Sequence, residues 1–126
     1  MEIKNKRVVV TGAASGIGRA LCEEFFANEV QSIVCVDMNI EGAEETAKNV
    51  NGIAISADVS VEKDIINVIK KANEFSGGID IFCSNAGIGG KPGLLNSEPS
   101  DWDKIWGVNV MSHIHAAKNV LPQMIE

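Results

Sequence analysis

The chain has 126 residues, enough for one domain with a buried core and too few for two domains of ordinary size. Hydrophobic residues make up 45% of it and charged residues 22%, a balance typical of a globular protein and not of a disordered one. The net charge is −6 with no basic stripe, so we expect no nucleic-acid partner. No apolar run reaches the length of a signal sequence or a membrane span, so we expect no membrane partner and a cytoplasmic location.

The first expected element is a strand, RVVVT at residues 7–11, and a glycine-rich loop overlaps its end in TGAASGIG, residues 11–18. A helix that follows such a loop offers unpaired N–H groups and a partial positive charge, which suits a phosphate. Gly12 suits a sharp turn, Gly16 leaves room for a ligand, and Gly18 permits close helix packing. The G-x-x-x-G-x-G spacing differs from the commonest dinucleotide fingerprint and from the P-loop, so the loop alone leaves an ordinary turn open.

A helix over residues 17–28 follows, and then a second buried strand, SIVCVD, which ends at Asp37. An acidic side chain at this place can accept hydrogen bonds from both hydroxyls of an adenosine ribose and would repel a phosphate on that ribose. Neither Ser15 nor Met38 supplies a basic partner for a 2′-phosphate. The pair of loop and carboxylate therefore favours NAD over NADP, whereas Asp37 alone is compatible with a solvated loop carboxylate.

Two more buried strands are expected in GIAISAD and IDIFCSN, at residues 52–58 and 79–85, with a helix over 61–75 between them. Ser60 is the expected N-cap of that helix. The expected apolar stripes are Ile17, Leu21, Phe25 and Phe26 on the first helix, and Val61, Ile65, Val68, Ile69, Ala72 and Phe75 on this one. The alternation of strands and helices predicts an α/β fold, a doubly wound parallel sheet of Rossmann type.

A last helix is expected from Asp101 to the carboxyl end, with Ser100 and Asp103 as a capping box and Pro122 as a kink. Its inward stripe is expected to be Trp102, Ile105, Trp106, Asn109, His113, Ala116, Ala117 and Val120. The helix is apolar beyond this stripe, so a partner subunit or further chain should cover it. His113 and His115 face directions about 200° apart on a helix, which argues against a metal site.

Three cysteines, Cys22, Cys35 and Cys83, are widely spaced among apolar neighbours. An odd, scattered set indicates neither a disulfide framework nor a zinc site, so we expect buried free thiols.

TGAASGIG, Asp37, ADVS at 57–60 and NAG at 85–87 occur in an order that resembles the classical short-chain dehydrogenase/reductase family, from about Lys6 to the end of the chain. The resemblance implies a sheet in strand order 3-2-1-4. It places Asp37 on the ribose hydroxyls and the NAG turn beside the first strand, at the switch point of the sheet. The implied cofactor-binding residues are Gly12, Ser15, Gly16, Ile17, Gly18, Asp37, Asp58, Val59, Asn85, Ala86 and Gly87.

Asn109 has two interpretations. A polar amide on an apolar stripe needs a partner, so it is either a buried, backbone-bonded residue or the catalytic Asn to which WGVNV is similar. In the family that residue supports a proton relay.

The resemblance also implies a catalytic Tyr, a Lys four residues beyond it and a Ser, yet the chain contains no tyrosine. We therefore expect residues 1–126 to be a single NAD-binding domain without the catalytic portion of the family, with weak or partial NAD binding and no turnover. The expected whole protein is an NAD-dependent oxidoreductase of alcohols or carbonyls and a homo-oligomer. A non-catalytic NAD-binding module and an assembly protein are the alternatives.

Overall fold

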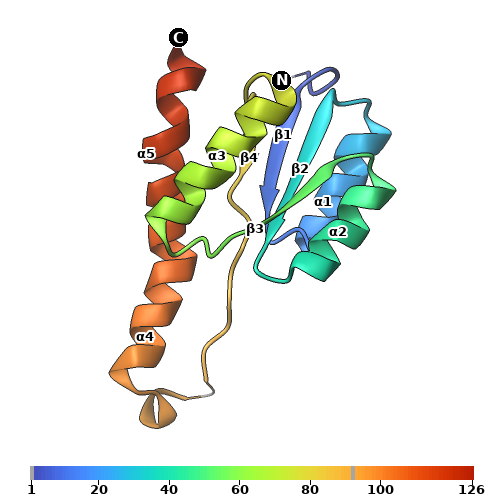
Figure 1. Cartoon of the computed structure of the whole chain (residues 1–126). Helices are drawn as coiled ribbons and strands as arrows, with labels where there is room; N and C mark the ends of the chain where they lie inside the picture. The colour runs from blue at the N-terminus through green and yellow to red at the C-terminus, as the bar shows by residue number, and fades with distance from the viewer. Residues whose placement is uncertain (1, 92) are drawn as a thin grey trace.

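The computed structural model describes residues 2–91 and 93–126 and is built on one parallel sheet (Figure 1). Its strands are β1 (Arg7–Thr11), β2 (Ser32–Asp37), β3 (Ile53–Ser56) and β4 (Ile81–Cys83). They lie in the order β3-β2-β1-β4, and each pair is parallel. The predicted doubly wound sheet of order 3-2-1-4 is confirmed, with β3 and the short β4 as its two edges.

Alternate residues of the strands feed two separate apolar cores, because successive side chains of a strand point to opposite faces. Val8 and Val10 pack with Cys22 and Ala43 on the side of α1 (Gly16–Ala27) and α2 (Ile40–Asn49). The opposite face carries Val9, Val34 and Val36, which belong to a core with residues of α3 (Glu62–Ser76) and α5 (Ser112–Ile125). The helices therefore cover both faces of the sheet (Figure 1). This double burial explains the uninterrupted apolar runs of the strands.

The apolar stripe predicted for α1 is partly wrong. Leu21 and Phe25 pack against the core, but Ile17 is 73% exposed and Phe26 is 45% exposed. Gly18 and Cys22 are the buried residues of this helix. Gly18 has no side chain and so carries no signal in a hydrophobic pattern, and the predicted stripe therefore missed part of the contact face.

The predicted N-cap of α3 is also wrong, because the helix begins at Glu62 with Val61 as the N-cap. The Ser60 hydroxyl donates instead to Asp58 Oδ1. Ile65, Val68, Ile69 and Ala72 are buried as predicted, whereas Val61 and Phe75 are 43% and 45% exposed.

The last predicted helix is present but differs in its start and its continuity. It begins as α4 (Pro99–Trp106), continues as a π-helical segment (Gly107–Met111), and ends as α5. The predicted Ser100–Asp103 capping box is wrong: the N-cap is Glu98, whose N–H donates to Asp101 Oδ2 at 2.9 Å. The α5 helix continues through Pro122 to Ile125, so the proline does not end it.

Four residues of the predicted inward stripe of this helix are exposed: Trp102 (48%), Trp106 (61%), His113 and Ala117. Val108, Ser112, Ala116 and Val120 are the buried ones. The π-helical segment changes the angular step between residues, so a regular 3.6-residue period does not describe the face. Among residues 2–91 and 93–126, no helix combines the length and the apolar character needed to cross a bilayer.

The three cysteines are free thiols, as predicted, but only Cys22 and Cys35 are buried. Cys83 is partly exposed, and burial of its thiol raises its pKa. The sulfur atoms of Cys22 and Cys35 lie 3.7 Å apart between α1 and β2.

Candidate nucleotide-binding site

A cleft of about 630 Å³ lies at the carboxyl ends of the strands, where doubly wound sheets bind their ligands. Its walls come from the loops that follow all four strands, together with parts of α4 and the π-helical segment. All the cofactor-binding residues expected from the sequence line this cleft: Gly12, Ser15, Gly16, Ile17, Gly18, Asp37, Asp58, Val59, Asn85, Ala86 and Gly87. The structure brings the set together, while its part in binding NAD stays a prediction.

Each glycine of the loop occupies its position for a different structural reason. Gly12 and Gly16 have φ angles of +73° and +54°, which side chains rarely adopt. A Cβ on Gly18 would lie 1.9 Å from the Gly12 carbonyl oxygen, so only glycine lets α1 pack this closely against the loop. A Cβ on Gly16 would meet nothing within 4 Å, because this residue borders the open cleft.

The first turn of α1 has donors available for an anion. Ser15 is the N-cap, but its side chain makes no capping hydrogen bond, and the first turn contains no acidic residue. The unpaired N–H groups and the positive end of the helix dipole therefore face the cleft without internal compensation. Ser15, Gly16 and Ile17 are exposed, whereas the preceding Ala13 and Ala14 are buried.

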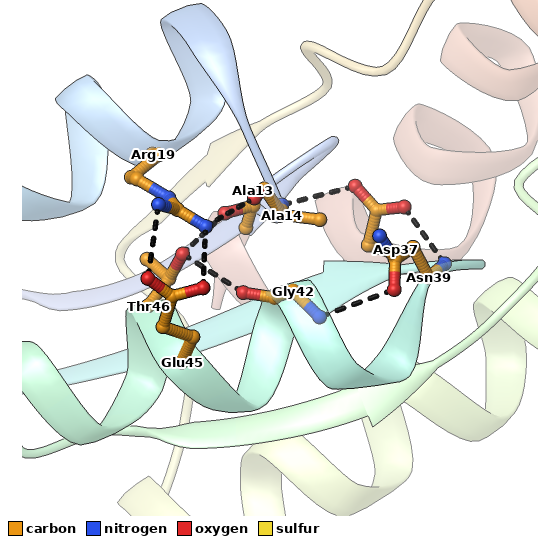
Figure 2. Close-up of polar contacts among 8 residues, drawn as sticks. All are labelled: Ala13, Ala14, Arg19, Asp37, Asn39, Gly42, Glu45 and Thr46. Carbon is orange, nitrogen blue, oxygen red and sulfur yellow. Dashed lines mark hydrogen bonds and ion pairs between the residues drawn. The ribbon is translucent and has the colours of Figure 1, made fainter.

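Asp37 is held in place by two backbone donors. Its Oδ2 accepts a hydrogen bond from the Ala14 N–H and its Oδ1 one from the Asn39 N–H, each at 3.0 Å (Figure 2). An ionised carboxylate has about four acceptor positions, so acceptor capacity remains for two ribose hydroxyls. Asp37 is thus part of the loop structure and not a freely solvated side chain.

Asp58 closes the next part of the cleft wall through a turn of its own. Its Oδ1 accepts hydrogen bonds from the Ser60 N–H at 2.9 Å and the Ser60 hydroxyl at 2.6 Å, while its N–H donates to Asp64 Oδ2 at 2.9 Å. Val59, between them, is only 6% exposed. The turn therefore presents a backbone edge and a small apolar surface, which suit a flat aromatic base.

Thr11 joins the ends of β1 and β4, and the sequence reasoning missed it. Its buried Oγ1 accepts from the N–H groups of Asn85 and Ala86 at 2.9 and 3.1 Å and donates to the Cys83 carbonyl at 3.3 Å. The Asn85 side-chain amide donates to the Thr11 carbonyl at 3.0 Å. A buried polar residue at the end of an apolar strand is the only signal that pointed to it.

Asn109 is bonded to backbone on both sides of its amide. Its Oδ1 accepts from the Ile88 N–H and its Nδ2 donates to the Ile88 carbonyl, both at 2.9 Å. Of the first interpretation, a buried, backbone-bonded residue, the backbone bonds are confirmed, whereas Asn109 is only partly buried. Asn109 lies in a π-helical segment, a feature frequent at functional sites. A catalytic role for Asn109 stays a prediction.

Lys104 is a second residue that the sequence reasoning missed. It is exposed on α4 and is the only Lys or Arg among the described residues that line the cleft. Lys104 of α4 and Val108 of the π-helical segment, four residues apart, both reach the cleft. That spacing becomes informative only when the position of the helix is known.

His113 and His115 belong to no cluster of metal ligands. Within the described parts of the chain, no group of three or more His, Cys, Asp or Glu side chains is arranged to hold a metal ion.

The sequence pattern of a known family covers nearly the whole chain: a family model described as short chain dehydrogenase matches residues 6–126. The chain belongs to the short-chain dehydrogenase family. Among its curated relatives is an uncharacterized oxidoreductase of Staphylococcus epidermidis, 32% identical over 127 residues, which span 99% of this chain and 55% of the relative.

Solved short-chain dehydrogenase structures share the fold. One from Burkholderia phymatum, in complex with NAD, matches 98% of this chain and 46% of its own with a TM-score of 0.93 and 29% identity. The 3-ketoacyl-(acyl-carrier-protein) reductase of Brucella melitensis, complexed with NADH, matches 96% of this chain and 51% of its own with a TM-score of 0.92 and 33% identity. The chain thus spans about half the length of these relatives.

Proposed function

We propose that this chain is the cofactor-binding part of an NAD-dependent oxidoreductase that moves hydride between the nicotinamide and an alcohol or carbonyl substrate. The observation that carries the proposal is that the uncapped start of α1 and the Asp37 carboxylate line one cleft. Backbone N–H groups suit a pyrophosphate and a fixed carboxylate suits ribose hydroxyls. Two related structures, one in complex with NAD and one with NADH, support the same cofactor.

We propose NAD and not NADP because of the charges around the ribose end of the cleft. Asp37 and Asp58 place two carboxylates among its lining residues, and Met38 and Asn39, next to Asp37, are uncharged. A 2′-phosphate there would be repelled at short range. Lys104, from α4, is the one basic residue among the described residues of the lining.

The proposed catalytic residue within this chain is Asn109, because its position in the π-helical segment borders the loop that carries the NAG turn. The chain contains no tyrosine, so we expect no hydride transfer from the 126-residue protein alone.

Calorimetric titration with NAD and NADP tests the cofactor. We expect NAD to bind more tightly than NADP, and Asp37→Ala to weaken NAD binding by about tenfold or more, since hydrogen bonds to a charged group contribute about 1.5–3 kcal/mol. Asp103→Ala removes an exposed carboxylate outside the cleft lining and should change the affinity less than twofold. Absence of NAD binding by the wild type would overturn the proposal, and measurable formation of reduced nicotinamide would overturn the expected inactivity.

We further propose that the chain associates with a second copy. The support is the set of large apolar side chains left exposed on α4 and α5: Trp102, Trp106, Ile114, Leu121 and Ile125. Sedimentation analysis should show a dimer or larger species, and Trp106→Glu should shift the protein toward the monomer. A wild type that stays monomeric would leave an assembly function without support.

We also propose a cytoplasmic location. The support is the odd, scattered set of three cysteines, which is not the pattern of a disulfide framework. Cell fractionation tests it directly.

A further inference from the structure

Behind the glycine-rich loop lies a set of polar contacts that never reaches the cleft. It joins the loop residues Ala13 and Ala14 to Arg19 of α1 and to Glu45 and Thr46 of α2 (Figure 2). Neither Arg19, Glu45 nor Thr46 lines the cleft. These side chains therefore make no direct contact with a ligand in the cleft, and they can affect its geometry only through the loop.

The peptide between Ala13 and Ala14 is held at both ends. Its carbonyl accepts a hydrogen bond from the Thr46 hydroxyl at 2.8 Å, and its N–H donates to Asp37 Oδ2 at 3.0 Å. Thr46 is fully buried, so water cannot replace this contact. A peptide bonded at both its carbonyl and its N–H cannot rotate without losing both partners.

The next peptide, between Ala14 and Ser15, is held at one end only. Arg19 Nη2 donates to the Ala14 carbonyl at 2.7 Å. In a trans peptide the carbonyl and the following N–H point in opposite directions. Because the Ala14 carbonyl points back toward Arg19, the Ser15 N–H points the other way, and Ser15 lines the cleft.

Arg19 is itself held by α2. Its two terminal nitrogens each lie 3.3 Å from an oxygen of Glu45, a fork-to-fork ion pair with the Arg19 side chain 30% exposed. The packing of α2 allows this approach, since a Cβ on Gly42 would lie 2.8 Å from the Ala14 Cβ. The α2 helix thus lies against the back of the loop.

We propose that Arg19, oriented by Glu45, is a positioning residue that turns the Ser15 N–H toward the cleft before the dinucleotide binds. This inference rests on the proposed NAD function. Without the guanidinium, the Ala14–Ser15 peptide has no partner that opposes its rotation, and the ligand must order it on binding.

NAD titration by calorimetry, well below the unfolding temperature, tests the positioning. We expect Arg19→Met to weaken NAD binding by about tenfold, the equivalent of one hydrogen bond to a charged group. Lys70→Met is the matched control, because it removes the same charge from an exposed ion pair on α3. Its affinity should stay within twofold of the wild type.

Two further measurements separate positioning from a loss of stability. The Ser15 amide resonance of free Arg19→Met should shift from its wild-type position, whereas Lys70→Met should leave it in place. Glu45→Gln weakens the ion pair that orients Arg19, so it should weaken NAD binding about threefold. Glu74→Gln, which weakens the exposed ion pair on α3, is its control. The Glu45→Gln variant also tests the positioning role if Arg19→Met does not fold.

The outcomes distinguish the two proposals. If the wild type binds NAD and the Arg19→Met and Glu45→Gln variants bind it with the same affinity, the positioning role is overturned and the proposed function stands. An unmoved Ser15 resonance does the same. A wild type that binds no NAD overturns both.

Discussion

The Asp37 carboxylate accepts a hydrogen bond from the Ala14 N–H at 3.0 Å, across 23 residues of sequence. The end of β2 is thereby joined to the back of the glycine-rich loop that follows β1 (Figure 2). Asp37 therefore has a structural part in the loop in addition to its proposed contact with the ribose.

Asp37→Asn should destabilise the fold although the two side chains have nearly the same shape. Both oxygens of Asp37 accept backbone N–H groups, so an amide NH₂ must face one of these donors. We expect a loss of about 0.5–1.5 kcal/mol in the free energy of unfolding by urea, the net contribution of one hydrogen bond, because the NH₂ can face the exposed Asn39 N–H. Asp103→Asn, on an exposed residue, is the control, and equal stability of the two variants would contradict the account.

Two glycines of the loop should respond to alanine differently, Gly18 mainly through stability and Gly16 mainly through NAD binding. Gly18→Ala places a Cβ 1.9 Å from the Gly12 carbonyl and should cost about 3 kcal/mol or more of stability. Gly16→Ala meets no atom within 4 Å and should cost about 1–2 kcal/mol, from its left-handed backbone alone. Its Cβ nevertheless borders the cleft, so this variant should fold and fail to bind NAD. Thermal unfolding and NAD titration of both proteins check the contrast; a Gly16→Ala protein with wild-type affinity would refute it.

The Arg7–Asp80 pair should make stability depend on acid pH. Asp80 accepts three hydrogen bonds from Arg7, each at 2.8 Å, and these bonds lower its pKa to about 2. The stabilisation is complete above the unfolded-state pKa of about 4 and is lost as the pH falls through about 2.

Asp80→Asn removes that contribution, so the variant should be less stable than the wild type by about 1–2 kcal/mol at pH 7, discounted for partial exposure. The difference should shrink between pH 4 and pH 2 in paired urea denaturations. A difference that is constant down to pH 2 would show that the pair is not its source.

Asn109→Asp should weaken the loop that carries the NAG turn. One carboxylate oxygen can still accept from the Ile88 N–H, but the other would face the Ile88 carbonyl, to which Nδ2 now donates at 2.9 Å. We expect a loss of about 2 kcal/mol at neutral pH. A protonated acid can donate to that carbonyl, which raises the folded-state pKa of the introduced carboxyl above its unfolded value of about 4, so the loss relative to the wild type should shrink as the pH falls towards about 4 and be small below it. A pH-independent difference would point to another cause.

The local chemistry of the sequence determined the strands and the glycine loop. Uninterrupted apolar runs predict strands buried on both faces, and β1 to β4 lie in those runs, although the edge strands β3 and β4 are only partly buried. The glycines at 12, 16 and 18 were assigned reasons that depend only on the geometry of a strand, a turn and a helix. Asp37 was placed by its position at the end of a strand. These inferences hold because they involve residues close together in the chain.

Periodicity was less informative at helix ends and irregular turns. The starts of α3 and α4 were assigned to Ser60 and Ser100, because a hydroxyl residue is a favoured N-cap, but the observed caps are Val61 and Glu98. Trp106 was placed inward by a regular period that the π-helical segment interrupts.

Only the tertiary structure decided which distant residues meet. Thr11 bonds to Asn85 across 74 residues, and Thr46 bonds to Ala13 across 33. Such pairs depend on how α2 and β4 pack beside β1, and no spacing in the chain encodes that distance. The sequence by itself therefore determined the elements and the loop chemistry, while packing decided the supports behind the loop, because a hydrogen bond forms where folding brings its partners together.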